Sequence, residues 1–572
     1  MRQAVPLSFS PDGTRLLVGS TVPGTQQLYE LPARGGEPTQ LTVEAEPVSG
    51  FFLPDGRVLV ERDEGGNERT QLYVLAGGLE PLVADPRFIH RTPCAAGTVL
   101  AYATNRRNEV DFDVVARDLA SGEERTWELG GHCSVEAVSP DGRLIAVDKL
   151  GERSGDNDLY VCDAVTGDVS HVTPHDEPAE FYSPVWVDGR LVLSTNDGRD
   201  TFAIACEGTV VYESRWDLDC AADEAGRSLL VLANEDGYTR LTLLDPRGFA
   251  VREDVPLPGH GVVEHPVFSA DGSLLAFSFS SPVEPHDVYL YDLDARELTR
   301  LTTSPRSVDP SGLREPTLHR FDSFDGESVP VFLFEPEGEG PFPVVVTVHG
   351  GPESQWLPWF SPSFAPLTQY LVSRGYAVAA PNVRGSTGYG KRYEHLDDVE
   401  KRLDSVRDLA ALHGWLAARP TIDGSKAVVY GRSYGGYMVL AALAFQPGLW
   451  AAGIECVGIS SLVTFLENTS PYRRAARERE YGSLERDRDF LVAASPMTHI
   501  DAIQAPLFIQ HGRNDPRVPV SESEHIHAVL TEKDVPCELL IFEDEGHLIE
   551  KLANRIETFT RAVAFLDRVL AA

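Results

Sequence analysis

The stretch GRSYG at residues 431–435 decides the fold of the second half of this chain. It follows a run rich in β-branched residues, 427–430, and opens an apolar stretch of helical character, 437–443. A serine between two glycines at a strand-to-helix turn is typical of a nucleophile elbow, because the glycines permit the tight turn that exposes the hydroxyl. The stretch therefore predicts an α/β-hydrolase sheet, doubly wound and mostly parallel, with Ser433 as nucleophile.

A serine nucleophile needs a base and an acid that orients the base. In α/β-hydrolases these follow in the order serine, acid, histidine, each on a loop after a strand. The apolar run 506–510 leads to Asp515, and the run 537–542 leads to His547. Both side chains thus follow the carboxyl end of a predicted strand, where open α/β sheets place their sites. We predict Ser433, Asp515 and His547 as the catalytic triad.

Rival acids and bases lie close to these positions. Asp544 and Asp534 compete as the acid, but both lie on the His547 side of the last predicted strand and suit turns better. His349 and His511 compete as the base; the first precedes a glycine pair and the second precedes the predicted acid. The order of the elements favours His547.

A third strand, 343–348, runs into the sequence HGGPE at residues 349–353. A glycine pair at this place lets a backbone N–H point at the oxyanion that develops during acyl transfer. The N–H of Tyr434, directly after the nucleophile, is the second predicted donor.

Short turns followed by apolar β-rich runs recur through the first half of the chain. The turn glycines stand at 13, 56, 97, 142, 189, 226 and 272, in steps of 37 to 47 residues. This period is typical of one four-stranded propeller blade per repeat. We predict an all-β, seven-bladed propeller, with a pair of β-sandwiches as the alternative. All seven repeats look whole, so we expect a ring without strand exchange between its ends.

Prolines 305, 310 and 316 interrupt the repeat and mark the domain boundary. We predict a propeller domain over residues 1–310 and a hydrolase domain over residues 311–572. Residues 319–334 then form a hairpin that leads the hydrolase sheet.

Residues 349–352, 382–390, 431–436 and 544–547 resemble the motifs of the prolyl oligopeptidase family of serine peptidases. The resemblance covers essentially the whole chain and is to the acylaminoacyl-peptidase-like bacterial branch. It implies a propeller on an α/β-hydrolase, the triad given above, and an oxyanion hole made by the amides of Gly351 and Tyr434.

The resemblance also implies roles at the substrate. Arg517 stands where prolyl oligopeptidases hold a substrate carbonyl. His349 stands where the prolyl and dipeptidyl branches have a tyrosine, so an oxyanion hole of backbone donors alone is implied. Phe465 and Glu467 lie where relatives build the pocket for the residue before the scissile bond.

A peptidase that recognises a free amine needs a carboxylate near the reacting carbonyl, and Glu353 and Glu467 are the candidates; Glu353 could equally be a solvent-facing loop residue. We predict a serine peptidase or amidase that acts on short peptides or small aminoacyl amides. Aminopeptidase-like and acylaminoacyl activity both stay open, with an ester or an aminoacyl antibiotic as alternative substrates. The alternative of another class is a catalytically idle propeller scaffold that binds proteins.

Composition limits the partners. The formal charge of −37 argues against nucleic-acid binding and is compatible with amine-bearing substrates or simply with an acidic surface. No apolar run approaches membrane-spanning length, and no leader segment precedes the first repeat, so we expect no membrane contact and a cytoplasmic location. Seven scattered cysteines without a C-x-x-C pair fit a reducing compartment and argue against structural zinc. Self-association is left open.

No cofactor or metal is expected. The segment 385–391 begins like a phosphate-binding loop, but Arg392 stands where that loop needs Ser or Thr. The pair His525 and His527 is too small a set of ligands for a metal site.

Overall fold

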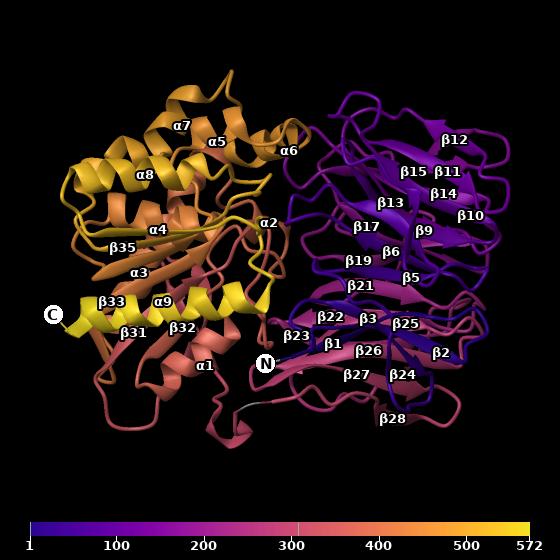
Figure 1. The fold of residues 1–572 in the computed structure, drawn as a ribbon, viewed down its shortest axis with the longest axis horizontal. Helices are drawn as coiled ribbons and strands as arrows, with labels where there is room; N and C mark the ends of the chain where they lie inside the picture. The colour runs from indigo at the N-terminus through magenta and orange to yellow at the C-terminus, as the bar shows by residue number, and fades with distance from the viewer. Residues whose placement is uncertain (1, 307, 572) are drawn as a thin grey trace. The chain divides into compact units, whose positions relative to one another are not determined.

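The computed structural model describes residues 2–306 and 308–571, and these residues form two compact units (Figure 1). The first unit lies within residues 2–306, and the second holds residues 308–571 together with the short segments 65–67 and 282–284. The division falls a few residues before the predicted boundary at 310, because the 3₁₀ helix η1 (Pro310–Gly312) already belongs to the second unit.

The described part of the first unit contains seven four-stranded antiparallel sheets, each built from four consecutive strands. Their bounds are β1 (Ala4–Phe9), β2 (Arg15–Ser20), β3 (Gln27–Pro32), β4 (Thr39–Gln40); β5 (Ser49–Phe52), β6 (Val58–Arg62), β7 (Gln71–Leu75), β8 (Leu79–Val83); β9 (His90–Ala96), β10 (Val99–Thr104), β11 (Asp113–Asp118), β12 (Glu124–Trp127); β13 (Cys133–Val138), β14 (Leu144–Leu150), β15 (Asn157–Asp163), β16 (Val169–His171); β17 (Phe181–Val187), β18 (Arg190–Thr195), β19 (Ala203–Cys206), β20 (Thr209–Tyr212); β21 (Asp217–Ala222), β22 (Leu229–Glu235), β23 (Tyr238–Leu244), β24 (Val251–Asp254); β25 (Val262–Phe268), β26 (Leu274–Ser281), β27 (Glu284–Asp292) and β28 (Glu297–Arg300).

The predicted repeat corresponds to these blades. All seven turn glycines lie between the first and second strands of a blade and have φ between 59° and 85°, a region that other residues avoid. In the first turn, the Asp12 carboxylate accepts hydrogen bonds from the Ser10 hydroxyl and the Thr14 N–H. The first strand of the first blade, β1, contacts the first strands β5 and β25 of its two neighbours in the ring. A seven-bladed propeller without exchanged strands is therefore confirmed, and the sandwich alternative is wrong.

The second unit contains one eight-stranded sheet in the order β29-β30-β32-β31-β33-β34-β35-β36. The β29–β30 pair is the predicted antiparallel hairpin, β30 runs antiparallel to β32, and the remaining pairs are parallel. The strands are β29 (Thr317–Asp322), β30 (Ser328–Phe334), β31 (Phe342–Val348), β32 (Ala377–Pro381), β33 (Ile422–Arg432), β34 (Ala452–Cys456), β35 (Leu507–Gly512) and β36 (Cys537–Phe542).

Helices cover both faces of this sheet. They are α1 (Ala365–Ser373), α2 (Lys391–Glu394), α3 (Arg402–Ala417), α4 (Tyr434–Phe445), α5 (Leu462–Asn468), α6 (Pro471–Tyr481), α7 (Arg488–Ala494), α8 (Ser521–Glu532) and α9 (Leu552–Ala571), with the 3₁₀ helices η2 (Val399–Lys401) and η3 (Pro496–Ala502).

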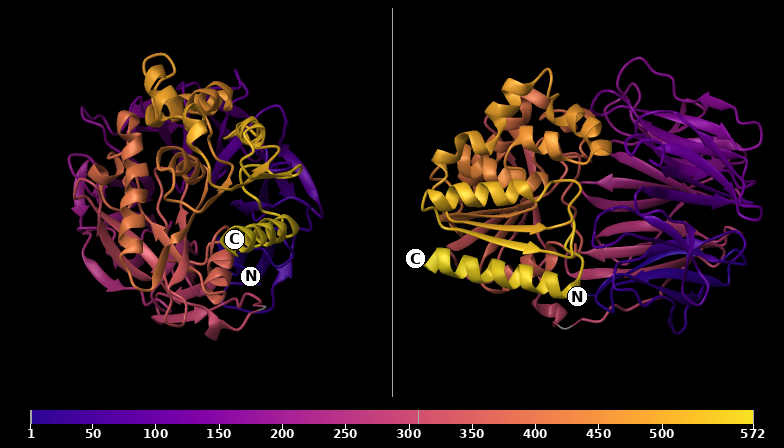
Figure 2. Two further views of the ribbon diagram at one scale, coloured as in Figure 1. Left: turned by 90° about the vertical axis from the view of Figure 1, so that its left-hand side faces the viewer. Right: turned by 45° about the horizontal axis from the view of Figure 1, so that its top comes forward.

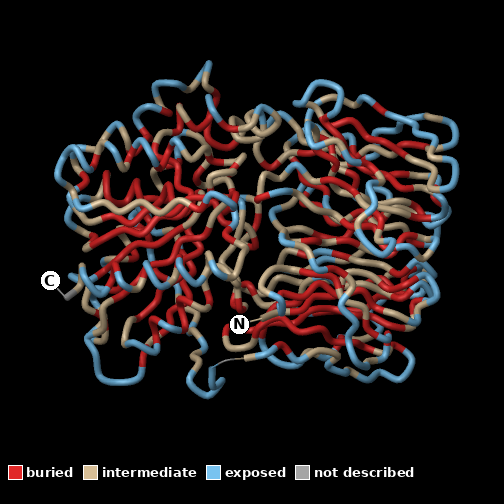
Figure 3. The backbone as a smooth tube through the Cα atoms, viewed as in Figure 1, coloured by how far each residue is buried: buried red, intermediate tan, exposed pale blue. Residues whose placement is uncertain are grey.

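Alternate residues of the sheet's central strands enter two separate cores. Val344 and Val429 pack with α3, α4 and α8, whereas Val345 and Val428 pack with α1 and α9. The C-terminal helix α9 and the helix α8 accordingly lie on opposite faces of the sheet (Figure 2). The central strands are buried over most of their length while the outer sides of the helices are exposed (Figure 3). This is the doubly wound sheet that the sequence predicts.

Candidate functional site

The predicted nucleophile lies in the turn between β33 and α4. Ser433 has φ 59° and ψ −120°, a backbone conformation that non-glycine residues rarely adopt and that is found at strained functional turns. A Cβ atom at Gly435 would lie 2.2 Å from the carbonyl oxygen of Val348, and one at Gly431 would lie 2.3 Å from that of Gly435. The glycines therefore permit the close approach of α4 to the strands, as expected of a nucleophile elbow.

The predicted acid and base are in contact. His547, after β36, has its Nδ1 atom 2.7 Å from Oδ2 of Asp515, which follows β35. The other carboxylate oxygen of Asp515 accepts hydrogen bonds from the N–H groups of Arg517 (2.8 Å) and Val518 (3.1 Å). Burial opposes the charge on Asp515, but His547 and His511 outweigh it and hold the pKa of the carboxyl well below its usual range. Asp515 is thus a fixed anion that orients His547.

The surroundings of the His547 imidazole favour its neutral form. Burial lowers its pKa, Asp515 raises it, and the cations of Arg517 and Arg432 lower it further, with a net decrease. Nε2 of His547 makes no hydrogen bond with the described residues, and neither does the Ser433 hydroxyl. A buried neutral imidazole with one nitrogen anchored and the other open is suited to accept a proton.

The two rival histidines are fully engaged. In His511, Nδ1 lies 2.7 Å from Oγ of Ser523 and Nε2 lies 2.9 Å from the Val518 carbonyl oxygen. In His349, Nδ1 lies 2.8 Å from the Gly350 carbonyl oxygen and Nε2 lies 2.8 Å from Oγ of Ser386. Burial lowers the pKa of His349 to about 4. Neither ring has a nitrogen available as a general base.

The two rival acids are placed elsewhere. Asp544 pairs with Lys551 (3.0 Å) and accepts a hydrogen bond from Asn554 (3.0 Å) at the surface. Asp534 is exposed in the turn after α8, with φ 58°. Both act as the turn residues that the order of elements predicts.

The loop after β31 lies against the nucleophile. A Cβ atom at Gly350 would lie 3.3 Å from Cβ and 3.9 Å from Oγ of Ser433. Gly351 follows with φ 130°, and a Cβ there would lie 2.7 Å from the Glu353 nitrogen. Tyr434 is the first residue of α4, where the backbone N–H groups have no partner within the helix and the helix dipole is positive. The arrangement brings the predicted oxyanion loop and the elbow together.

Three of the four candidate substrate residues lie in different surroundings. The Arg517 side chain is close enough to His547 to lower the pKa of its imidazole. Phe465 is buried and packs edge-to-face on Tyr481, with ring centroids 5.6 Å apart. Glu467 is exposed on α5 and forms an ion pair with Arg488 at 3.0 Å, so its carboxylate already has a cationic partner.

Glu353 is partly exposed, with 31% of its side chain accessible. Its nearest cationic group, the Arg477 guanidinium, lies 3.6 Å away, beyond normal hydrogen-bond length. Burial, together with repulsion from Glu480, raises the pKa of Glu353 to about 7. Among the described residues no donor hydrogen bonds to this carboxylate, although the cations of Arg477, Arg402 and Arg479 act on its charge.

Sequence reasoning missed a cluster of charges behind Tyr434. The Tyr434 hydroxyl donates to Asp397 at 2.8 Å, and the Arg402 guanidinium pairs with both Asp397 and Glu480. Asp397, Asp398 and Glu480 place carboxylate oxygens within 4.8 Å of one another, a spacing that could suit a metal ion. Arg402 supplies the positive charge at two of them. No pattern of spacing in the sequence indicates these contacts, because the cluster joins three stretches of the chain, 397–402, 434 and 480, that are far apart in the sequence.

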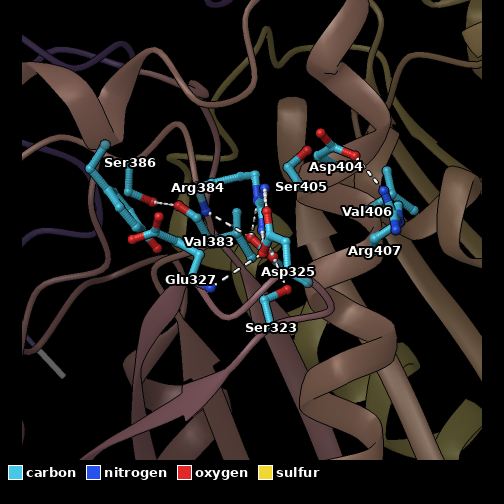
Figure 4. A network of polar contacts seen from close by, with 12 residues as sticks. Ser323, Asp325, Glu327, Val383, Arg384, Ser386, Asp404, Ser405, Val406 and Arg407 are labelled. Carbon is cyan, nitrogen blue, oxygen red and sulfur yellow. Dashed lines mark hydrogen bonds and ion pairs between the residues drawn. The ribbon is translucent and has the colours of Figure 1, made fainter.

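A buried arginine directly precedes the segment 385–391 that begins like a phosphate-binding loop. Arg384 is buried and binds Asp408 of α3 at 2.9 Å and Asp325, in the turn after β29, at 3.0 Å (Figure 4). These contacts hold residues 382–386 against the hairpin and α3, as an ordinary loop of the sheet. In the described residues, no helix combines the length and apolar character needed to cross a membrane.

This chain is similar to known proteins in sequence and in fold. The sequence profile of the prolyl oligopeptidase family matches residues 362–572. The dipeptidyl aminopeptidase BIII of Pseudoxanthomonas mexicana is 27% identical over 591 residues, covering 95% of this chain and 83% of that protein. The dipeptidyl peptidase family member 6 of Caenorhabditis elegans is 30% identical over 336 residues, covering 53% of this chain and 44% of that protein. A puromycin hydrolase of known structure shares the fold, with a TM-score of 0.86, 19% identity, and coverage of 99% and 95% of the two chains.

Proposed function

We propose that this chain, whose C-terminal domain belongs to the prolyl oligopeptidase family, is a peptidase that hydrolyses short peptides or small aminoacyl amides with a free amino terminus. That the chain is a serine hydrolase follows from its relatives. The observation that supports the free-amine assignment is the Glu353 carboxylate, which accepts no hydrogen bond from the described residues and stands two residues beyond the predicted oxyanion glycine.

Acyl transfer begins when Ser433 attacks the substrate carbonyl and Nε2 of His547 takes the hydroxyl proton. Asp515 fixes the tautomer through Nδ1 and stabilises the imidazolium. The amides of Gly351 and Tyr434 bind the oxyanion, a contribution of about 3–4 kcal/mol per donor. His547 then protonates the leaving amine, and water hydrolyses the acyl-enzyme in the reverse sequence of proton transfers.

The substrate's ammonium group would bind Glu353. A charge-assisted hydrogen bond of this kind contributes roughly 1.5–3 kcal/mol. Glu467 is the weaker candidate, because Arg488 already donates a hydrogen bond to it at 3.0 Å, whereas the arginine beside Glu353 lies 3.6 Å away. An acylaminoacyl substrate carries no charge at this end and gains nothing from Glu353, so the free-amine assignment is preferred. The dipeptidyl aminopeptidase among the relatives is in keeping with it.

A first experiment tests the nucleophile. The wild-type protein should be labelled covalently by a fluorophosphonate, and Ser433→Ala should abolish both labelling and turnover while circular dichroism stays unchanged. An unlabelled wild-type protein would point to the idle scaffold instead.

A second experiment tests the substrate end with paired aminoacyl and N-acetyl-aminoacyl naphthylamides, and with puromycin as a further free-amine amide. Glu353→Gln should lower kcat/KM for the free amines by roughly ten- to a hundredfold and leave the acetylated substrate unaffected. Glu467→Gln is the matched control and should change neither. A selective loss in Glu467→Gln would move the amine site to α5, and equal losses on both substrates would make Glu353 a loop-supporting residue.

A further inference from the structure

We infer that Arg402 is a positioning residue for the oxyanion hole, a single buried cation that fixes both residues whose amides bind the oxyanion. The inference rests on the proposed function, because it concerns the site where Ser433 reacts. Arg402 is the first residue of α3 and its side chain is fully buried.

Arg402 acts on Tyr434 in two ways. Its guanidinium lies 5.1 Å from the centre of the Tyr434 ring, and it pairs with Asp397, whose carboxylate accepts the Tyr434 hydroxyl at 2.8 Å. The same hydroxyl lies 2.7 Å from Oγ of Ser405, which donates to the Arg402 carbonyl at 2.7 Å. The Tyr434 side chain is therefore held on three sides, and with it the start of α4 that carries the oxyanion N–H.

Arg402 reaches the other donor through a second tyrosine. The guanidinium lies 4.9 Å from the Tyr481 ring and pairs with the carboxylate of Glu480, whose backbone carbonyl it also contacts at 2.9 Å. The Tyr481 hydroxyl donates to the Gly351 carbonyl at 3.4 Å, a long hydrogen bond. One guanidinium thus ties the end of α6 and the oxyanion loop to the elbow.

A contribution to folding stability does not by itself explain the buried ion network around Arg402. A buried ion network carries a desolvation cost that apolar side chains of similar size would avoid. The cation also sits at the N-terminus of α3, where the helix dipole favours negative charge. The Nε–H of Arg402 finds no hydrogen-bond acceptor in the described part of the chain. What the network does provide is a fixed spacing between the amides of Gly351 and Tyr434, which must both point at one oxygen atom.

The test compares Arg402→Met and Arg402→Lys with the wild type on an N-acetylated aminoacyl amide. This substrate is chosen because Arg402 also lowers the pKa of Glu353, which would complicate results with free amines. We expect kcat to fall by about ten- to a hundredfold with KM changed less than about threefold, since a displaced donor weakens the transition state and not substrate binding. The affinity for a peptidyl boronate, which forms a tetrahedral adduct with the serine, should fall by the same factor as kcat.

Arg402→Lys should recover thermal stability more than it recovers boronate affinity. A lysine ammonium keeps the charge but cannot bridge two carboxylates while lying flat against two rings. Tyr481→Phe removes only the hydroxyl that reaches Gly351 and is expected to lower kcat about three- to tenfold, so it keeps the test informative if the Arg402 variants fold poorly.

Arg384→Met is the matched control, because Arg384 is also buried, pairs with two carboxylates and lies 4.6 Å from the Phe324 ring. It should lower the melting temperature without weakening boronate binding. Normal kcat and boronate affinity in Arg402→Met would overturn the inference, as would equal losses in Arg384→Met. A wild-type protein that fluorophosphonate does not label would instead overturn the proposed function.

Discussion

Asp515 and His547 show how burial and neighbours divide two roles between adjacent residues. The carboxylate receives two backbone N–H groups and the His547 ring, which lower its pKa and favour its charged form. The imidazole is buried beside two arginines and stays neutral until it accepts a proton. This geometry suits the division of roles that we propose, in which the acid orients and the base transfers the proton of a serine nucleophile.

Asp515→Asn should lower kcat by about 10⁴, because an amide at this position favours the wrong imidazole tautomer. The measurement is steady-state turnover of an aminoacyl naphthylamide. Asp544→Asn is the control at the neighbouring acid and should leave kcat unchanged, since that side chain pairs with Lys551 at the surface. A loss of less than tenfold in Asp515→Asn, or a large loss in Asp544→Asn, would reassign the orienting acid.

The pH dependence should distinguish the two ends of the site. His547 must be neutral to act, and Glu353, whose pKa is raised to about 7, must be charged to bind an ammonium group. For free-amine substrates kcat/KM should therefore rise first as His547 loses its proton, below the ordinary histidine pKa of about 6.5, and rise again through pH 7 as Glu353 does. It should fall when the substrate amine, with a pKa of about 8, is deprotonated.

N-acetylated substrates should show only the acid limb due to His547 and no alkaline limb from the amine. In Glu353→Gln the acid limb for free amines should become as shallow as that for acetylated substrates. Identical profiles for both substrates in the wild type would contradict a role of Glu353 in amine binding.

Among the elements, the nucleophile elbow depends most on backbone space. A Cβ atom at Gly435, in the first turn of α4, would meet carbonyl oxygens of Val348 and His349 at 2.2 Å and 2.7 Å. Gly414 lies in the interior of α3 with no atom within 4 Å of such a Cβ. A glycine-to-alanine substitution should therefore cause a steric clash at Gly435 and none at Gly414.

Gly435→Ala should abolish activity and lower the melting temperature, because α4 and β31 must separate to admit the methyl group. Gly414→Ala should stabilise the protein by roughly 0.5–1 kcal/mol, since alanine is the better helix former. Differential scanning calorimetry and turnover measure both. An active Gly435→Ala variant would contradict this expectation, because it would show that α4 can accommodate a methyl group beside the Val348 carbonyl oxygen.

The sequence is most informative where local chemistry determines the backbone. The turn glycines predict the blades because a positive φ at each turn requires them. The apolar runs predict β31, β33, β35 and β36, of which the first three are largely buried and β36 is mostly half-buried at the edge of the sheet. The triad follows from the order of residues after those strands. Arg402 could not be predicted, since its partners Asp397, Glu480 and Tyr434 meet only through the packing of α3, α4 and α6.

Over the whole molecule, acidic residues outnumber basic ones strongly, with a formal charge of −37. A field of this sign raises the local concentration of cationic solutes, and salt screens it over about 10 Å at 0.1 M ionic strength. Glu353 contributes only one of these net charges. Removing it would therefore remove its local attraction for an amine while leaving the field of the whole molecule almost unchanged, so experiment can separate the two effects.

For a free-amine substrate, kcat/KM should fall by roughly three- to tenfold between about 0.02 M and 0.5 M salt, because screening removes the attraction by the whole molecule. The N-acetylated partner substrate should change little over the same range. Glu353→Gln should lower kcat/KM for the free amine at every salt concentration while leaving the slope against salt almost unchanged, since 36 of the 37 net charges remain. If the slope vanished in the variant, the salt dependence would belong to the Glu353 contact alone, and the net charge would play no part in gathering the substrate.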